Sequence, residues 1–242
     1  MDSATERIER HPRRVRRFHG AVWLVTVGLL VTGWWILLGG EGRPSPLARV
    51  SGVADTRLHV WLGWTLAALT VGVAAVGHRG IATFVRETVR RDRGDARWWR
   101  RWPAAAFTGR FARHEGLFDP GQRIANVLLV GGLLGLVVTG MAMTLLHGGP
   151  VFAWMSRVHR WTTIAISPVI AGHVLIAAGV LPGYRGAARS MHVDGRLRAA
   201  TARRLWPGWA DLASRPADQH PDADRLKVAS SSNDSHPERR DQ

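Results

Sequence analysis

Four histidines in strongly apolar surroundings are the side chains of this sequence best suited to chemistry. His159 and His173 stand 14 residues apart in one apolar stretch. A helix places them on one face, roughly 21 Å apart along its axis. His19 and His59 stand at the starts of two other apolar stretches. Ionisable side chains are costly to bury in a bilayer, so these four residues are candidates for function.

If the apolar stretches cross a membrane in alternating directions, the histidines form two pairs. His59 and His159 then lie near the outer surface, and His19 and His173 lie on the cytoplasmic side. Two imidazole pairs at two depths of a four-helix bundle suit two haems, each iron taking one imidazole from each of two helices. Zinc sites and proton relays also use histidine, but the spans contain no carboxylate to support either.

The sequence has no cysteine. This excludes a disulfide framework, a thiolate zinc site, a protein-ligated iron–sulfur cluster and a covalently attached c-type haem. The predicted cofactors are therefore two non-covalent b-type haems, with His19, His59, His159 and His173 as axial ligands of the iron.

Other residues near the spans have more general interpretations. His78 and His147 have no partner at a matching depth, so we assign them to the membrane interface. Gly33 and Gly72 lie at the predicted depths of the two haems and could give a macrocycle clearance, although glycine is also common wherever transmembrane helices pack.

A short sequence echo links the first and third apolar stretches. Residues 28–33 read Gly-Leu-Leu-Val-Thr-Gly, and residues 135–140 read Gly-Leu-Val-Val-Thr-Gly. The match indicates either a duplicated helix pair or a coincidence in sequence rich in glycine and valine.

The elements that must position the histidines are membrane-spanning helices. Four stretches lack Asp, Glu, Lys and Arg, and each supplies the roughly 20 residues that a spanning helix needs: 18–40, 58–78, 124–156 and 161–184. We predict an all-α, integral membrane four-helix bundle over residues 18–184. Its spans are expected at about 18–40, 58–78, 124–147 and 159–182.

The distribution of arginine predicts the orientation. Six Arg precede the first span, and eleven lie in the loop 79–123 between the second and third spans. The positive-inside rule places this basic loop and both termini in the cytoplasm. Orientation and attraction to anionic lipid account for the net charge of +15, so no nucleic-acid partner is expected.

The segments outside the spans are polar. Residues 1–17 form a basic cytoplasmic N-terminus rather than a cleavable signal. Residues 185–210 are a basic cytoplasmic segment, and residues 211–242 have the composition of a disordered tail. Within the basic loop, residues 97–102 mix Trp with Arg, which is typical of a helix lying in the membrane interface.

Haem propionates are anionic and need cations near the membrane surfaces. Arg57 and Arg160 neighbour the outer ligands, and Arg16 and Arg17 flank the inner ligand His19. Arg16 and Arg17 could instead serve only to set the topology.

Several motifs along the chain resemble a known family over roughly residues 13–210. The motifs are Phe18-His19, Thr32-Gly33, Leu58-His59 with Gly63, Phe118-Asp119-Pro120-Gly121-Gln122-Arg123, Thr139-Gly140, His159 with His173, Asp194-Gly195-Arg196 and Trp206-Pro207-Gly208-Trp209. Together they resemble the cytochrome b (gamma) subunit of membrane-bound formate dehydrogenases, within the bacterial di-haem cytochromes b561.

The resemblance implies an electron path through the bacterial inner membrane. An iron–sulfur subunit, fed by a catalytic subunit, would deliver electrons to the haem of His59 and His159. Electrons would continue to the haem of His19 and His173, and then to a membrane quinone. The chain has no machinery to oxidise formate by itself, so it would be the electron-transfer and quinone-reducing subunit of an oxidoreductase complex.

The resemblance also points to a quinone site in the segment before the third span. Gln122 offers an amide donor there, and Gly121 lets the backbone turn into the span. Asp119 stands where the family usually has Asn, so it could relay a proton. The alternative is that Asp119, followed by Pro120, simply caps the helix.

Three alternatives remain open at this point. The chain could be the cytochrome b of a hydrogenase or thiosulfate reductase complex, or a stand-alone cytochrome b561. In a different class, it could be a transporter or non-redox membrane scaffold whose histidines only pack.

Overall fold

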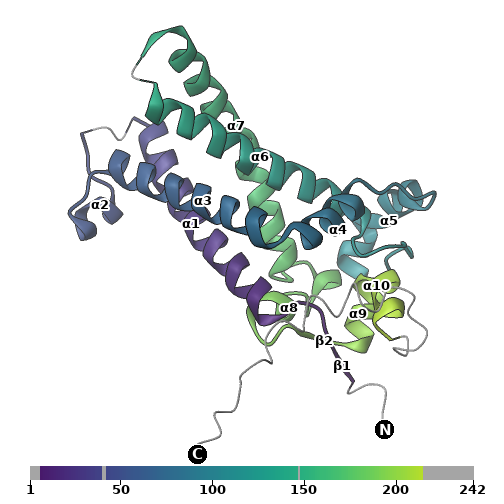
Figure 1. Cartoon of the computed structure of the whole chain (residues 1–242). Helices are drawn as coiled ribbons and strands as arrows, with labels where there is room; N and C mark the ends of the chain where they lie inside the picture. The colour runs from purple at the N-terminus through teal and green to yellow at the C-terminus, as the bar shows by residue number, and fades with distance from the viewer. Residues whose placement is uncertain (1–5, 40–41, 147, 215–242) are drawn as a thin grey trace, which may run out of the picture.

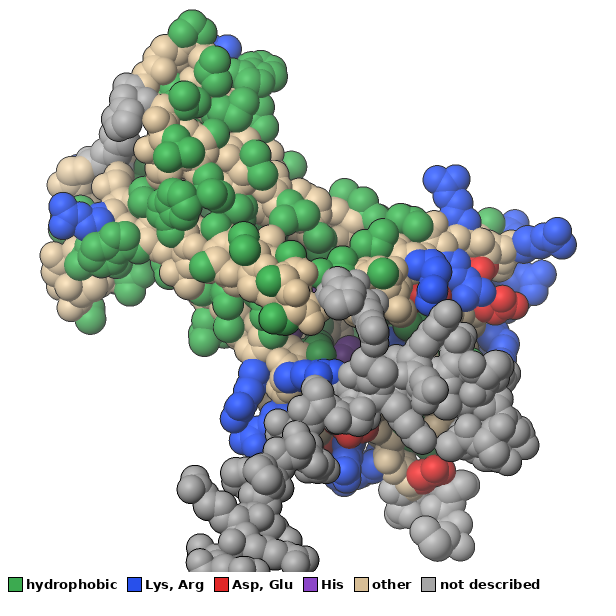
Figure 2. All heavy atoms as spheres, in the orientation of Figure 1, with side chains coloured by type: hydrophobic (Ala, Val, Ile, Leu, Met, Phe, Trp, Pro, Cys, Tyr) green, Lys and Arg blue, Asp and Glu red, His purple; other side chains and the backbone are tan. Residues whose placement is uncertain are grey.

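The computed structural model describes residues 6–39, 42–146 and 148–214. Four of its helices are long and apolar enough to cross a membrane, as the sequence predicts: α1 (Arg13–Leu37), α3 (Asp55–Val76), α6 (Pro120–Leu145) and α7 (Gly149–Ala177). Most of their apolar side chains face outward, as Figure 2 shows for one face of the bundle. Such a surface suits lipid, and the prediction of an all-α membrane bundle is confirmed.

The long helices form two pairs (Figure 1). Helix α1 packs along α3, α6 packs along α7, and α3 joins the pairs through α6. Helix α1 approaches α7 over a shorter length, where the Trp34 Nε1–H donates to Ser167 Oγ at 2.9 Å. The histidines of α1 and α3 can therefore meet those of α7 across the bundle.

The helices and the uncharged stretches have different limits. Helix α7 begins at Gly149, where the positive φ of Gly148 and Gly149 turns the chain, and Arg157 and Arg160 lie inside it. It ends at Ala177, just before Gly179 adopts a φ of +72°. Hydropathy marks the apolar part of a helix, whereas the backbone hydrogen bonds continue through charged turns.

A short helix, α2 (Pro46–Ser51), lies in the connection between α1 and α3. Ser45 caps it by accepting from the Ala48 N–H at 3.1 Å, and the Ser45 hydroxyl itself donates to Asp55 at the start of α3. We call this end of the bundle the far end.

The opposite end carries a folded unit, which we call the cap. It comprises β1 (Arg7–Glu9), α4 (His78–Val89), α5 (Asp95–Thr108), the 3₁₀ turn η1 (Pro182–Tyr184), α8 (Arg189–His192), β2 (Arg196–Arg198), α9 (Ala199–Leu205) and α10 (Pro207–Ala213). Strand β1 pairs with β2 in antiparallel register, with Arg7 opposite Arg198. Many of the arginines visible in Figure 2 surround this unit.

The cap has its own apolar core. Tyr184, Leu197, Leu205 and Trp206 are buried together, with Ile8 of β1 packed against them. The segment 185–210, expected only to be basic, therefore alternates exposed arginines with buried apolar side chains. Helix α10 continues through Ala213 into the segment expected to be disordered, and residues 215–242 lie outside the described part of the chain.

Helix α5 contains the tryptophans that suggested an interfacial helix, but it is part of the cap. Trp98 is only 2% exposed. The Trp102 Nε1–H donates to the Tyr184 hydroxyl at 2.8 Å. Trp98 therefore packs inside the protein, and the placement of this helix in the membrane interface stays a prediction.

Of the two histidines assigned to the interface, His78 is the first residue of α4. His147 lies outside the described residues.

Candidate metal centres

The far-side pair consists of His59 on α3 and His159 on α7. Their ring centroids are 6.1 Å apart and their planes are inclined by 80°. A metal ion about 2 Å from one nitrogen of each ring would separate the centroids by roughly 6 Å. The two imidazoles thus have the spacing of two axial ligands on one iron.

A threonine on the neighbouring helix orients His59. The Thr32 hydroxyl donates to the Gly28 carbonyl at 2.8 Å, and its oxygen lies 2.9 Å from His59 Nδ1. Because the hydroxyl proton is already used, the oxygen accepts from Nδ1–H. The ring then presents Nε2 with its free electron pair, which is the form that binds a metal.

The same arrangement recurs in the second helix pair. The Thr139 hydroxyl donates to the Gly135 carbonyl at 2.7 Å and lies 2.9 Å from His159 Nδ1. The sequence echo therefore has a structural meaning, because both copies place a threonine against a histidine of the adjacent helix. A Cβ at the glycine after each threonine would come within 3.1 Å of His59 at Gly33, and within 3.4 Å of His159 at Gly140.

The cap-side pair consists of His19 on α1 and His173 on α7. Their ring centroids are 6.4 Å apart, with planes inclined by 49°. The structure therefore brings together all four predicted histidines, in the predicted pairs. No such contact surrounds Gly72, where a Cβ would have nothing within 4 Å.

The cap adds a third histidine that the sequence did not single out. The ring of His192, on α8, stands edge-on to His19 with centroids 5.9 Å apart. His192 lies among arginines after the last span, so neither burial nor periodicity marked it. Only its distance from His19 marks it, and that distance depends on how the chain folds back.

The four arginines predicted to hold propionates have different surroundings. Arg16 donates to the Val193 carbonyl at 2.6 Å, while its Nε is enclosed and has no hydrogen-bond partner in the part of the chain that the structure describes. Arg17, Arg57 and Arg160 are exposed. Arg16 therefore has an unused donor beside the cap-side pair, as an anionic group would require.

The segment predicted to contact quinone forms the junction between α6 and the cap. Asp119 is buried and caps α6, its carboxylate accepting from the Gln122 N–H at 2.8 Å. Gly121 faces the Trp98 ring, which a Cβ would approach to 2.8 Å. The Gln122 carbonyl oxygen accepts from the Trp206 indole at 3.0 Å, leaving its NH₂ group as the donor. Burial raises the pKa of Asp119 above its usual range.

An N-terminal arginine completes this junction. Arg10 donates to the Leu117 carbonyl at 2.7 Å, and its guanidinium lies 4.8 Å from the Trp206 ring centroid and 4.4 Å from that of Trp209. Burial lowers the pKa of Arg10 to about 9. The negative charge of Asp119 acts in the opposite direction but does not offset the effect of burial. Two motifs that are far apart in the sequence, at residues 118–123 and 206–209, therefore meet here.

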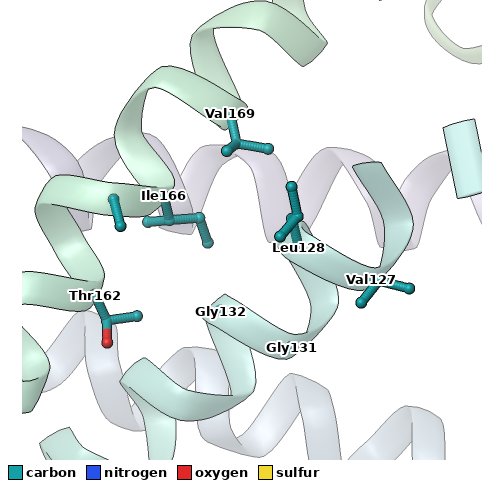
Figure 3. Close-up of a pocket in the computed structure, with 8 residues that line it drawn as sticks. Val127, Leu128, Gly131, Gly132, Thr162, Ile166 and Val169 are labelled. Carbon is teal, nitrogen blue, oxygen red and sulfur yellow. The ribbon is translucent and has the colours of Figure 1, made fainter. Parts of the chain in front are cut away.

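An apolar cavity of about 330 Å³ lies between α6 and α7 (Figure 3). Ile166, seven residues from both His159 and His173, packs against Gly132 beside it. The cavity walls carry almost no polar groups, so they offer no ligands for chemistry.

The donor set favours haem over other metal centres. Within residues 6–39, 42–146 and 148–214, no group of three or more His, Asp or Glu side chains is arranged to hold a metal ion. A zinc site needs three or four protein ligands, whereas haem iron already has four ligands from its macrocycle and needs only two imidazoles. The two histidine pairs fit haem in this respect.

Comparison with known proteins assigns a family to this arrangement. No curated protein matches the sequence. A family model described as prokaryotic cytochrome b561 matches residues 10–192, which include both histidine pairs and reach the end of α8. The match covers most of the chain, and the chain therefore belongs to the prokaryotic cytochrome b561 family.

Proposed function

We propose that this chain carries electrons across a bacterial inner membrane through two b haems, from an iron–sulfur partner to membrane quinone. The family supports the general role of a membrane protein that transfers electrons through haem b. One observation carries the finer proposal: two pairs of imidazoles lie at two depths of one bundle, with centroids 6.1 Å and 6.4 Å apart.

A b haem supplies reversible one-electron reduction of iron. The two histidine pairs would hold the irons, and Thr32 and Thr139 fix the tautomers of His59 and His159. Arg16, Arg17, Arg57 and Arg160 are the proposed cations for the propionates.

The direction of transfer rests on the arginine distribution. The arginine-rich cap is the proposed cytoplasmic side, with both termini. The far end would then face the iron–sulfur subunit and its catalytic subunit, as in a formate dehydrogenase-type complex. Asp119, Gly121 and Gln122 are the proposed quinone contacts, because they lie at the junction of α6 and the cap.

Transfer across a sealed bilayer tests the proposal. Purified protein is placed in liposomes that contain ferricyanide, and a membrane-impermeant reductant is added outside. Internal ferricyanide should be reduced faster than in protein-free liposomes, and a quinone in the bilayer should be reduced as well. Protein that contains haem but supports neither reaction would contradict the proposed function.

Replacing Thr32 with valine should weaken the far-side site specifically. The change removes the acceptor of the His59 Nδ1–H, and loss of such a partner typically weakens metal binding by about tenfold. The matched control is Thr65→Val, because the Thr65 hydroxyl makes the same kind of bond to a carbonyl four residues earlier, at 2.8 Å, on an exposed face of α3. Haem titration should separate the two variants, and equal affinities would contradict the role of Thr32.

Replacing Asp119 with asparagine separates a proton relay from a helix cap. The asparagine oxygen can still accept from Gln122 N–H, but it cannot titrate. If Asp119 relays protons, quinone reduction should slow while both haems stay reducible. A wild-type rate across the pH range would leave Asp119 as a cap only.

The same substitution has a pH signature in stability. Because burial raises the pKa of Asp119, the wild-type fold is penalised when the carboxyl ionises. The contribution of the protonated Asp119 side chain to stability is present at low pH and is lost as the pH rises through the folded-state pKa. The Asp119→Asn protein should therefore gain in melting temperature relative to wild type as the pH rises above about 4, the ordinary pKa of an aspartate.

A further inference from the structure

The two histidine pairs differ in how their Nδ1 atoms are supported. On the far side, each ring has a threonine oxygen 2.9 Å from Nδ1. On the cap side, the Nδ1 of His19 is enclosed in protein and has no hydrogen-bond partner among the described residues. An enclosed N–H without a partner is costly, and metal-binding histidines commonly donate this hydrogen to a neighbouring group.

His192 is the polar ring beside His19. The two rings meet nearly edge to face, at 70°, with centroids 5.9 Å apart. A direct hydrogen bond between two imidazoles, with nitrogens about 2.9 Å apart, brings the centroids to roughly 5 Å. A movement of under about 1 Å would therefore make the bond, and the exposed position of His192 leaves its side chain room to turn.

The cap fixes the segment that carries His192. The Arg189 side chain, one turn earlier on α8, donates to Asp194 at 2.8 Å. The Arg16 guanidinium on α1 donates to the Val193 carbonyl at 2.6 Å, beside His192. Helix α8 is thereby tied to the same turn of α1 that bears His19.

We propose that His192 is the positioning residue of the cap-side site, where its unprotonated ring nitrogen accepts the Nδ1–H of His19. His192 does for His19 what Thr32 does for His59: it fixes the tautomer and makes the iron-binding nitrogen more basic. A more basic ligand stabilises the oxidised iron. His192 thus lowers the potential of the cap-side haem, and this inference rests on the proposed haem-binding function.

Two substitutions test the role on the holoprotein. His192→Leu removes the acceptor, and His192→Gln keeps an acceptor oxygen. In a redox titration of the purified protein, the ratio of reduced to oxidised cap-side haem at a fixed potential should rise about tenfold in His192→Leu. This corresponds to about 59 mV for one electron. His192→Gln should stay close to wild type.

The far-side haem in the same sample is the internal control, because His192 does not contact His59 or His159 among the described ring contacts. Its potential should not move in either variant. An unchanged cap-side potential in His192→Leu would overturn the proposal, and so would a glutamine variant that behaves like the leucine variant. Protein without any haem would instead refute the proposed function, so the two failures are distinguishable.

Discussion

Alanine at His59 or at His159 is expected to remove the same haem and to leave the other in place. Each substitution deletes one of two imidazoles whose centroids are 6.1 Å apart, and one axial ligand does not hold a low-spin b haem. Both variants should lose about half of the haem absorbance, and the remaining spectrum should be the same in the two proteins.

The reciprocal variants are the matched controls. His19→Ala and His173→Ala should remove the other haem, because these two rings form the cap-side pair. A redox titration distinguishes the remaining haem in each case by its potential. If His59→Ala and His159→Ala left haems of different potential, the pairing would be wrong.

Replacing Arg123 with methionine is expected to destabilise the cap strongly. The Arg123 side chain is only 5% exposed, and it forms ion pairs with Asp92 at 2.6 Å and with Asp95 at 3.2 Å. It also donates to three carbonyls, those of Arg90, Glu115 and Phe118. Removing one partner of a buried ion pair typically costs about 3–5 kcal/mol, because the other charges lose their compensation.

Thermal unfolding and limited proteolysis of the purified protein measure this effect. Arg91→Met is the matched control, because Arg91 is exposed and forms no ion pair within the described residues. The Arg123 variant should melt well below wild type and be cleaved in the cap, while the Arg91 variant should match wild type. Equal melting temperatures for the two variants would show that the Arg123 cluster does not stabilise the cap.

The cations of this cluster also act on Asp92. Burial alone would raise the pKa of Asp92, but hydrogen bonds from Arg90 and Arg123 lower it below the usual value. The sequence identified Arg123 only as the basic end of a motif. The acceptors of the Arg123 side chain lie in the connection between α4 and α5, at the first residue of α5 and in the segment before α6, so only the folded chain reveals them.

The membrane bundle could be predicted from sequence because its signal is local. A run of about 20 uncharged residues identifies a span, and the 14-residue spacing of His159 and His173 follows from helix geometry alone. The pairing of the four histidines required only alternating helix directions. The paired rings lie as that argument requires.

The cap could not be predicted in the same way. Its elements are short, and its core joins Ile8, Tyr184 and Leu205 from distant parts of the chain. Arginine-rich sequence between these positions hides the buried residues, so composition indicated only a basic segment. The contact of His192 with His19 could not be predicted either, because it depends on how α8 folds back on α1.

The two glycines singled out in the sequence have different surroundings. Gly33 was one candidate for clearance at the far-side haem, and it lies against the His59 ring. Gly72 was the matching candidate on the cap side; a Cβ built there meets no described atom within 4 Å, so its role in haem clearance stays a prediction. Sequence position along a helix gives the depth of a residue, whereas its neighbours depend on the packing of other helices.

The haem content of the purified wild-type chain tests the central claim most directly. Protein expressed with ample haem should contain two b haems per chain by pyridine haemochrome assay, and low-temperature electron paramagnetic resonance should show two low-spin signals from bis-histidine iron. Colourless protein, or protein that holds a single haem at saturation, would contradict the account of two histidine pairs as two haem sites.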